Sequence, residues 1–147
     1  MQLRLYTDYA LRALLYVGAR PAEPVPSSTI ARAYGISVDH LAKATKALTR
    51  AGLLRATRGA GGGVKLARPP AEIRIGDVVR RFEGGEGIVR CLGEHPEACP
   101  IVPACRLRGA LQRAEEAFYR ELDRYTLEDL LRNREQLVKL LHPLERR

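Results

Sequence analysis

The chain has 147 residues, of which 46% are hydrophobic, and this is the size and apolar content of one ordinary folded domain. The composition excludes a wholly disordered chain, and no apolar run approaches the roughly 18 residues that suggest a membrane span. The formal net charge of +8 lies entirely in residues 1–70, because residues 71–147 carry equal numbers of basic and acidic side chains. We therefore expect a cytoplasmic protein that has no membrane segment and whose basic N-terminal half binds nucleic acid.

The first third of the chain predicts three helices. Residues 1–20 form the first, with Thr7 as its expected cap. The second begins near Ser28 and ends at Gly35, and Ser37 is placed to cap the third. Two short helices joined by a turn that contains glycine are typical of a helix-turn-helix.

A β-hairpin is predicted next. Residues 53–58 and 64–68 are short strand-like runs on either side of a glycine-rich turn. A phosphate-binding loop is the alternative interpretation of these glycines, but the turn lacks both glycine patterns of such loops. A hairpin directly after a helix-turn-helix is a wing, so the predicted fold class is mainly α with a small β wing.

The C-terminal half predicts helices around an irregular segment. A short helix is expected over residues 73–82, and a long amphipathic helix runs from Cys105 to about Tyr125. Thr126 and Asp129 have the spacing of a capping box before one final helix. The predicted units are a winged helix-turn-helix domain over residues 1–70, a connecting helix and loop over 71–104, and a long helix plus C-terminal helix over 105–147.

The third predicted helix presents small and basic polar groups on one face, as a helix in a DNA major groove requires. An ordinary solvated helix face is the alternative, but the preceding helix, the following wing and the local charge favour DNA. Arg58, at the wing tip, is a candidate for insertion into the minor groove. The candidate DNA-contacting residues are Ser28, Ser37, His40, Lys43, Lys46, Arg50, Arg58 and Gly61.

Three cysteines, Cys91, Cys99 and Cys105, lie in or next to the irregular segment. A disulfide is disfavoured by their odd number and by the expected cytoplasmic location. Buried structural cysteines are the second possibility, and metal ligation is the third. The spacing is wider than that of paired zinc ligands, which favours an iron–sulfur cluster over zinc. Local candidates for a further ligand are His95 and the glutamates at 94 and 97.

Several short segments together resemble one known family over almost the full chain. They are Tyr6-Thr7-Asp8-Tyr9-Ala10, Arg58-Gly59-Ala60-Gly61-Gly62-Gly63, Ile75-Gly76-Asp77-Val78-Val79 and Pro103-Ala104-Cys105-Arg106-Leu107. The chain resembles the Rrf-type winged-helix regulators, and within them the nitric-oxide-sensing iron–sulfur repressors. The resemblance implies a homodimer that reads a palindromic double-stranded DNA operator, with the long helix as the dimer interface.

The resemblance also implies a ligand set. Cys91, Cys99 and Cys105 match the cluster ligands of the family. Asp8 matches the carboxylate that completes a 4Fe–4S cluster from the other protomer, with Arg12 nearby. First-turn stabilisation of its helix is the alternative role of Asp8.

One departure bears on the type of cluster. Related regulators of iron–sulfur biogenesis carry a histidine three residues after the last cysteine, where this chain has Arg108. A 2Fe–2S cluster with that histidine is therefore disfavoured, and a 4Fe–4S cluster is favoured. Asp8 and the segment Tyr6-Thr7-Asp8-Tyr9 favour nitric oxide as the effector. The alternatives are an iron-responsive repressor of the RirA type and, from another class, an iron–sulfur electron-transfer or cluster-carrier protein. We expect no enzymatic activity, because no coupled catalytic set or nucleotide-binding loop is present.

Overall fold

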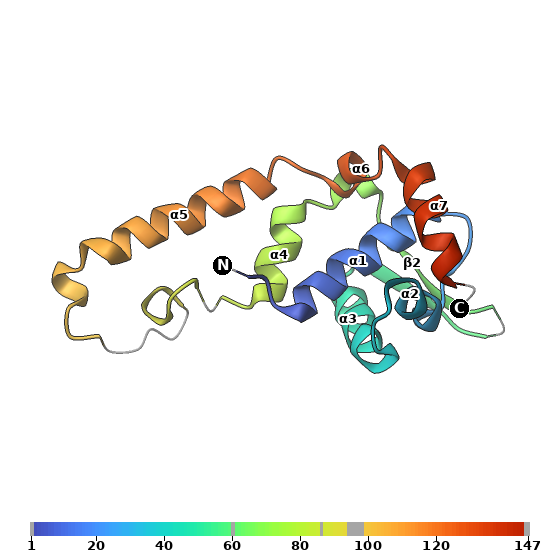
Figure 1. The fold of residues 1–147 in the computed structure, drawn as a ribbon, viewed down its shortest axis with the longest axis horizontal. Helices are drawn as coiled ribbons and strands as arrows, with labels where there is room; N and C mark the ends of the chain where they lie inside the picture. Colours follow the sequence, from blue (N-terminus) through green and yellow to red (C-terminus); the bar gives the residue numbers. More distant parts are fainter. Residues whose placement is uncertain (1, 60, 86, 94–98, 146–147) are drawn as a thin grey trace.

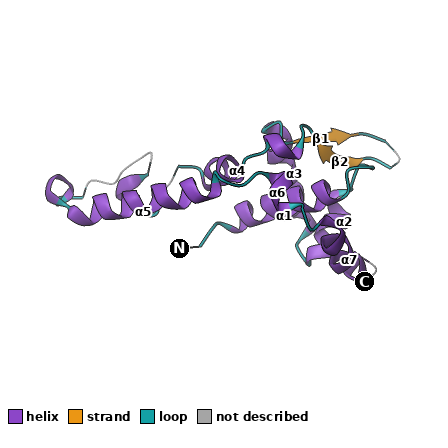
Figure 2. Cartoon of the chain, turned by 90° about the horizontal axis from the view of Figure 1, so that it is seen from above, coloured by secondary structure: helices purple, strands orange, loops and turns teal. Residues whose placement is uncertain are grey.

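The computed structural model describes residues 2–59, 61–85, 87–93 and 99–145, and within these ranges the chain is mostly helical with one two-stranded sheet (Figures 1 and 2). The predicted fold class is confirmed. Nowhere in the described ranges is a helix both long and apolar enough to cross a membrane. The elements are α1 (Leu5–Ala19), α2 (Ser27–Tyr34), α3 (Val38–Arg50), β1 (Leu54–Thr57), β2 (Gly63–Leu66), α4 (Ile75–Glu83), α5 (Arg106–Leu122), α6 (Leu127–Leu130) and α7 (Arg134–Glu145).

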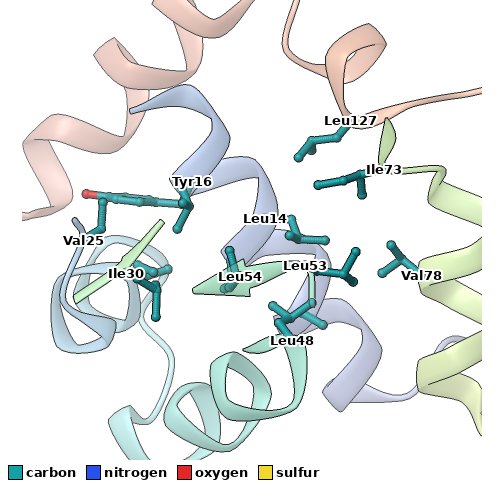
Figure 3. Close-up of a cluster of buried hydrophobic side chains, with 14 of the residues drawn as sticks. Leu14, Tyr16, Val25, Ile30, Leu48, Leu53, Leu54, Ile73, Val78 and Leu127 are labelled. Atoms are coloured by element: carbon teal, nitrogen blue, oxygen red, sulfur yellow. The ribbon is translucent and has the colours of Figure 1, made fainter. Parts of the chain in front are cut away.

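The core surrounds α1, which lies centrally in Figure 1 and contacts α3, α4, α6, α7 and β2. Leu14 and Tyr16 of α1 are almost fully buried, as is Leu48 of α3 (Figure 3). Leu127 of α6 belongs to the same cluster although it is far away in the chain. Burial of each such side chain contributes about 1.5–3 kcal/mol, so the core holds both ends of the sequence together.

The start of α1 differs from the sequence prediction. The helix begins at Leu5, and the predicted cap Thr7 is a buried residue of its first turn. The hydroxyl of Thr7 donates to the carboxylate of Glu83, which also accepts the backbone N–H of Arg4 at 3.1 Å. The predicted capping role of Thr7 is therefore wrong, because a carboxylate from α4 binds the amide end of α1 instead.

The predicted final helix is divided in two. The capping box is confirmed: Thr126 Oγ1 accepts from the backbone of Asp129, and the Asp129 carboxylate accepts from the backbone of Thr126. However, α6 ends at Leu130, and Asn133 precedes α7 with its carbonyl accepting from the first turn of the new helix. A single helix over this segment was wrong, because Asn favours the position before a helix over a helix interior.

The break between α6 and α7 turns α7 back onto α1 and α2. Gly18 of α1 permits this packing, because a Cβ there would lie 2.6 Å from a methyl group of Leu131. Helix α7 therefore lies beside the helix-turn-helix at the opposite end of the molecule from most of α5 (Figure 1).

Helix α5 extends away from this packed body (Figures 1 and 2). None of its 17 residues is buried, and Leu107 near its start is 65% exposed. Only its second half approaches the core, where Phe118, Tyr119 and Leu122 pack as partly buried side chains. The predicted amphipathic helix is present, and the first half of its apolar face lacks cover within the described part of the chain.

Candidate nucleic-acid interface and cysteine loop

Helix α3 shows a clear division between a buried and an exposed side. Leu41, Ala44, Thr45 and Leu48 face the core. The predicted outward residues His40, Lys43, Lys46 and Arg50 are all exposed, and we call these four residues the reading face. Spacings of three and four residues place them on adjoining turns of one helix surface.

The reading face is held in place by α1 and α2. The ring of His40 stacks on Tyr9 of α1, with centroids 6.3 Å apart and planes inclined by 22°. The hydroxyl of Tyr6 donates to the carbonyl of Lys43 at 3.2 Å. On the opposite side, Ser27 of α2 and Thr45 of α3 share a hydrogen bond of 3.1 Å. These contacts fix the angle of α3 against the first helix of the motif.

The turn between α2 and α3 has the geometry of a helix-turn-helix. Gly35 ends α2 with φ of 64°, a conformation that glycine adopts without strain. Ser37 directly precedes α3 and Ser28 lies in the first turn of α2, and both are exposed as predicted. The side chain of Ser37 makes no capping hydrogen bond, which leaves its hydroxyl available to an external acceptor such as a phosphate.

The wing is an antiparallel hairpin in which Leu54 pairs with Leu66 and Thr57 with Gly63. The first strand is one residue shorter than predicted at each end, and the second begins one residue earlier and ends two residues earlier than predicted. Arg58 and Gly61 are exposed at the turn, as expected of a wing tip. Gly62 is required there, since a Cβ would lie 2.5 Å from the carbonyl oxygen of Thr57.

Unpaired positive charge covers the reading face and the wing. In the described part of the chain, none of these cations forms an ion pair: Lys43, Lys46, Arg50, Arg55 and Arg58. Exposed cations without ion-pair partners attract polyanions, and each one that neutralises a phosphate releases a counterion from the nucleic acid.

The three cysteines occupy the segment of residues 84–105 between α4 and α5, which we call the cysteine loop. Cys91 and Cys105 are half-buried, Cys99 is exposed, and all three are free thiols. Among the described residues they do not gather into a metal-binding group. The candidate ligands His95 and the glutamates at 94 and 97 lie outside the described residues.

Arg108 joins the two half-buried cysteines. Its Nε donates to the carbonyl of Cys91 at 3.2 Å, and its backbone N–H donates to Sγ of Cys105 at 3.4 Å. Cys105 is also the residue before α5, so its sulfur faces the amide end of that helix. In the sequence, Arg108 is notable only because it stands where related regulators carry a histidine. The structure shows that its hydrogen bonds connect the Cys91 and Cys105 parts of the cysteine loop.

Asp8 and Arg12 are adjacent on α1, as their spacing predicts, and their side chains form an ion pair of 2.8 Å. The pair is partly exposed, and Asp8 does not meet the cysteines within the described part of one chain. The guanidinium of Arg12 also lies 5.5 Å from the ring centroid of Tyr34 at the end of α2. Burial raises the pKa of the Tyr34 hydroxyl.

A further cluster, absent from the sequence prediction, joins α4 to α5. Arg80 forms a bidentate pair with Asp123, at 2.7 and 2.5 Å, and its guanidinium lies 4.8 Å from the ring centroid of Tyr119. A Cβ at Gly76 would lie 1.9 Å from the Asp123 carboxylate, so glycine permits the approach. We call Arg80 and Asp123 the latch. Its hydrogen bonds hold the pKa of Asp123 below the usual range.

This arrangement of three helices, turn and hairpin defines a winged helix-turn-helix protein. The chain belongs to the Rrf2 family, described as iron-dependent transcriptional regulators, whose family model matches residues 3–133. It is therefore a transcriptional regulator with DNA as its partner. Transcriptional regulators of this family are not enzymes.

Two curated relatives are similar over nearly their whole length. The HTH-type transcriptional regulator NsrR of Geobacillus kaustophilus is 48% identical over 142 residues, which cover 96% of this chain and 97% of the relative. The protein of the same name from Halalkalibacterium halodurans is 43% identical with the same coverage. The resemblance to the Rrf-type regulators, and to NsrR among them, is confirmed.

Solved structures agree with this family. The IscR structure of T. potens has a TM-score of 0.74 at 25% identity, covering 93% of this chain and 90% of that one. CymR, the global cysteine regulator of B. subtilis, has a TM-score of 0.70 at 28% identity and covers 88% and 95%. The overall arrangement of this chain is thus shared by regulators that carry different names.

Proposed function

We propose that the protein is a homodimeric repressor that binds a palindromic operator under the control of an iron–sulfur cluster, with nitric oxide as its effector. The observation that carries the DNA-binding part is the set of unpaired cations on the reading face and wing tip. Lys43, Lys46 and Arg50 contact the major groove and its phosphates, and Arg58 reaches the adjacent minor groove.

The dimer is supported by the uncovered face of α5. Leu107 is 65% exposed and Tyr125, just beyond the helix, is 41% exposed, whereas a stable isolated helix needs a partner for its apolar face. A second copy of α5 supplies the same residues in a symmetric contact. This places two reading faces on one duplex.

The cluster is supported by the chemistry of its donors. Cys91, Cys99 and Cys105 are free thiols within 15 residues of one another, and thiolates are the usual ligands of iron–sulfur clusters. Asp8 is exposed enough to reach another protomer as a fourth ligand, and a 4Fe–4S cluster accommodates this set. When bound, the cluster supplies iron atoms that react with nitric oxide.

The chain's own residues connect this loop to the reading face. Arg108 holds the Cys91 and Cys105 segments together, and the latch fixes α5 to α4. Asp8 lies next to Tyr9, which stacks on His40. A change in the contacts of Asp8 therefore occurs at the residue directly before Tyr9, whose ring makes the stacking contact with α3.

One finding favours a second candidate function. The family description names iron dependence, so iron supply itself is the alternative signal at the same cysteines. In that case the operator affinity follows the iron content of the protein and is insensitive to nitric oxide when the cluster is intact.

The test uses anaerobically purified protein and a duplex selected from a random-sequence pool. We expect a brown protein whose duplex affinity falls steeply with salt and falls again after nitric oxide is added. Cys105→Ser should remove the colour and the response to nitric oxide. Arg50→Ala should weaken duplex binding and leave the colour unchanged.

These variants separate the two halves of the proposal. A colourless wild-type protein with equal affinity before and after nitric oxide contradicts the sensing part alone. Affinity that does not depend on salt contradicts the DNA-binding part.

A further inference from the structure

The part of the cysteine loop that carries Cys91 folds into a compact turn. Residues 90–92 form one turn of 3-10 helix, and the N–H of Leu92 donates to the carbonyl of Val89 at 2.9 Å. Gly87 permits this fold, because a Cβ there would lie 2.8 Å from the backbone of Leu92. Its φ of +65° is a conformation that glycine adopts without strain. We call residues 87–93 the Cys91 turn.

Two side chains of α5 hold the Cys91 turn. Nε of Arg108 donates to the carbonyl of Cys91 at 3.2 Å, and the carboxylate of Glu115 accepts the backbone N–H of Ile88 at 3.0 Å. Each bond involves a charged group, and such bonds are about twice as strong as neutral ones. Both bonds are partly buried, which limits competition from water. They join residues that are 17 and 27 positions apart in the chain.

Arg108 and Glu115 occupy one stripe of α5. They are seven residues apart, which is about two helical turns, so their side chains lie on the same side of the helix. Ile88 precedes Cys91, whereas its partner Glu115 follows Arg108, so the Cys91 turn runs antiparallel to α5 (Figure 1). Leu107 stays exposed beside this stripe, so the two anchors leave the proposed dimer face of α5 open.

The other two cysteines reach α5 by a local route. Cys105 directly precedes the helix, and its backbone N–H donates to the carbonyl of Val102 at 3.3 Å. The N–H of Val102 in turn donates to the carbonyl of Cys99 at 3.1 Å. Successive turns therefore connect Cys99 and Cys105 to the start of α5. The Cys91 turn depends instead on side chains that are distant in the chain.

We propose that Arg108 and Glu115 are positioning residues, which hold Cys91 beside α5 before a cluster binds and after it is lost. This role rests on the proposed function for the identity of the bound group, whereas the two hydrogen bonds are made by the chain's own atoms. Because the Cys91 turn is already held on α5, less conformational freedom is lost when the thiols take up metal. Groups that orient metal ligands commonly change metal affinity by about 10–100-fold.

The first test measures amide hydrogen exchange in the iron-free, full-length protein. The Ile88 amide should be protected in the wild type and should exchange at least about tenfold faster in Glu115→Ala, because its acceptor is lost. Glu115→Gln keeps a carbonyl oxygen as acceptor and should restore most of the protection. Glu116→Ala is the matched control, because the Glu116 carboxylate accepts from Gln112 of the same helix and not from the Cys91 turn.

The second test uses Co²⁺ alone as a probe of the thiols in the same iron-free protein. Thiolates bind this soft-tolerant ion and give a charge-transfer absorption band, whose growth with Co²⁺ concentration measures the affinity. Arg108→Ala and Glu115→Ala should each weaken Co²⁺ binding by about tenfold or more. Arg113→Ala removes an exposed arginine of the same helix and should leave the affinity unchanged, as should Glu116→Ala. Circular dichroism reports that each variant is folded.

The outcomes separate this role from the proposed function. Exchange of the Ile88 amide that is equally fast in the wild type and in Glu115→Ala would overturn the role of Glu115. Unchanged Co²⁺ affinity in Arg108→Ala and Glu115→Ala, or equal weakening in Glu116→Ala, would overturn the positioning of Cys91. A wild-type protein that protects Ile88 but shows no cobalt–thiolate band supports the two anchors and contradicts the cluster of the proposed function.

Discussion

Helices α1 and α5 are of similar length and both carry apolar residues at helical spacing, yet they have opposite environments. Eight of the 15 residues of α1 are buried, whereas none of the 17 residues of α5 is. The apolar side of α1 is covered by four other helices and the hairpin of its own chain. The face of α5 has no such cover along its first half.

The same helical spacing of apolar residues therefore has two different outcomes in one molecule. In α1 it builds the core, and in α5 it leaves an exposed apolar face, which is the surface that we propose for a second copy. Positive charge follows the same division, since the surplus lies on the packed N-terminal half. Substitutions on either side can test this division between the packed winged helix-turn-helix and the projecting helix α5.

The largest expected effect is on stability. Leu14→Ala in α1 should lower the free energy of unfolding by about 2–5 kcal/mol, because the side chain is fully buried and leaves a cavity. The matched substitution Leu107→Ala in α5 should cost less than about 0.5 kcal/mol in dilute protein. Urea unfolding at two protein concentrations measures both, and equal costs on dilution would show that α5 is packed within its own protomer.

The next effect is on DNA affinity. Arg58→Ala at the wing tip should weaken specific duplex binding by about 1–3 kcal/mol, because the side chain is lost from a base or groove contact. Arg120→Ala on α5 should leave affinity within experimental error. Fluorescence anisotropy at fixed salt compares the DNA affinities of the two variants. An unchanged affinity of Arg58→Ala would show that the wing tip does not contact the duplex.

A smaller effect concerns the salt dependence of binding. Lys46→Gln should reduce the slope of the logarithm of affinity against the logarithm of salt concentration by about 1, as expected for one lost phosphate contact. Its affinity loss should be similar for specific and random duplexes. A slope equal to that of the wild type means that Lys46 does not meet a phosphate.

The smallest effect tests the latch between the two regions. The pKa of the Asp123 carboxyl is lowered by its hydrogen bonds to Arg80, so its contribution to stability is complete above the ordinary aspartate pKa. That contribution is lost as pH falls through the lowered pKa of the folded state. Asp123→Asn should therefore show a smaller loss of melting temperature on acidification than the wild type, and identical losses would show that the latch does not contribute.

Much of the winged helix-turn-helix could be predicted from the sequence, because its turns and helix faces are specified by residues that are close together in the chain. Glycine at 35 and the glycine-rich run after Arg58 fix turns through backbone conformation, and helical spacing separates Leu41 and Leu48 from His40 and Lys43. The capping box at Thr126 was predicted for the same reason. Each of these features depends on residues within a few positions of one another.

The errors in the prediction arose where distant residues compete with local signals. Thr7 has the chemistry of a cap, but Glu83, 76 residues away, takes that position. Asn133 is itself a local indication that a helix begins after it. The direction in which α7 then runs depends on its packing against α1, which no local pattern indicates. The latch between Arg80 and Asp123 and the role of Arg108 required the tertiary structure, because their partners have no fixed spacing in the chain.

The amino-acid sequence alone predicts a basic winged helix-turn-helix followed by a neutral half with three cysteines and a long amphipathic helix. These features can be predicted because charge, helical periodicity and turn chemistry are properties of neighbouring residues. The folded chain shows in addition that α7 returns to the helix-turn-helix, that the first half of α5 keeps an uncovered face, and that a cavity forms between α7 and residues 20–26. These features depend on which surfaces pack together. Apolar surfaces are buried where their shapes fit most closely, whatever the separation of the residues along the chain.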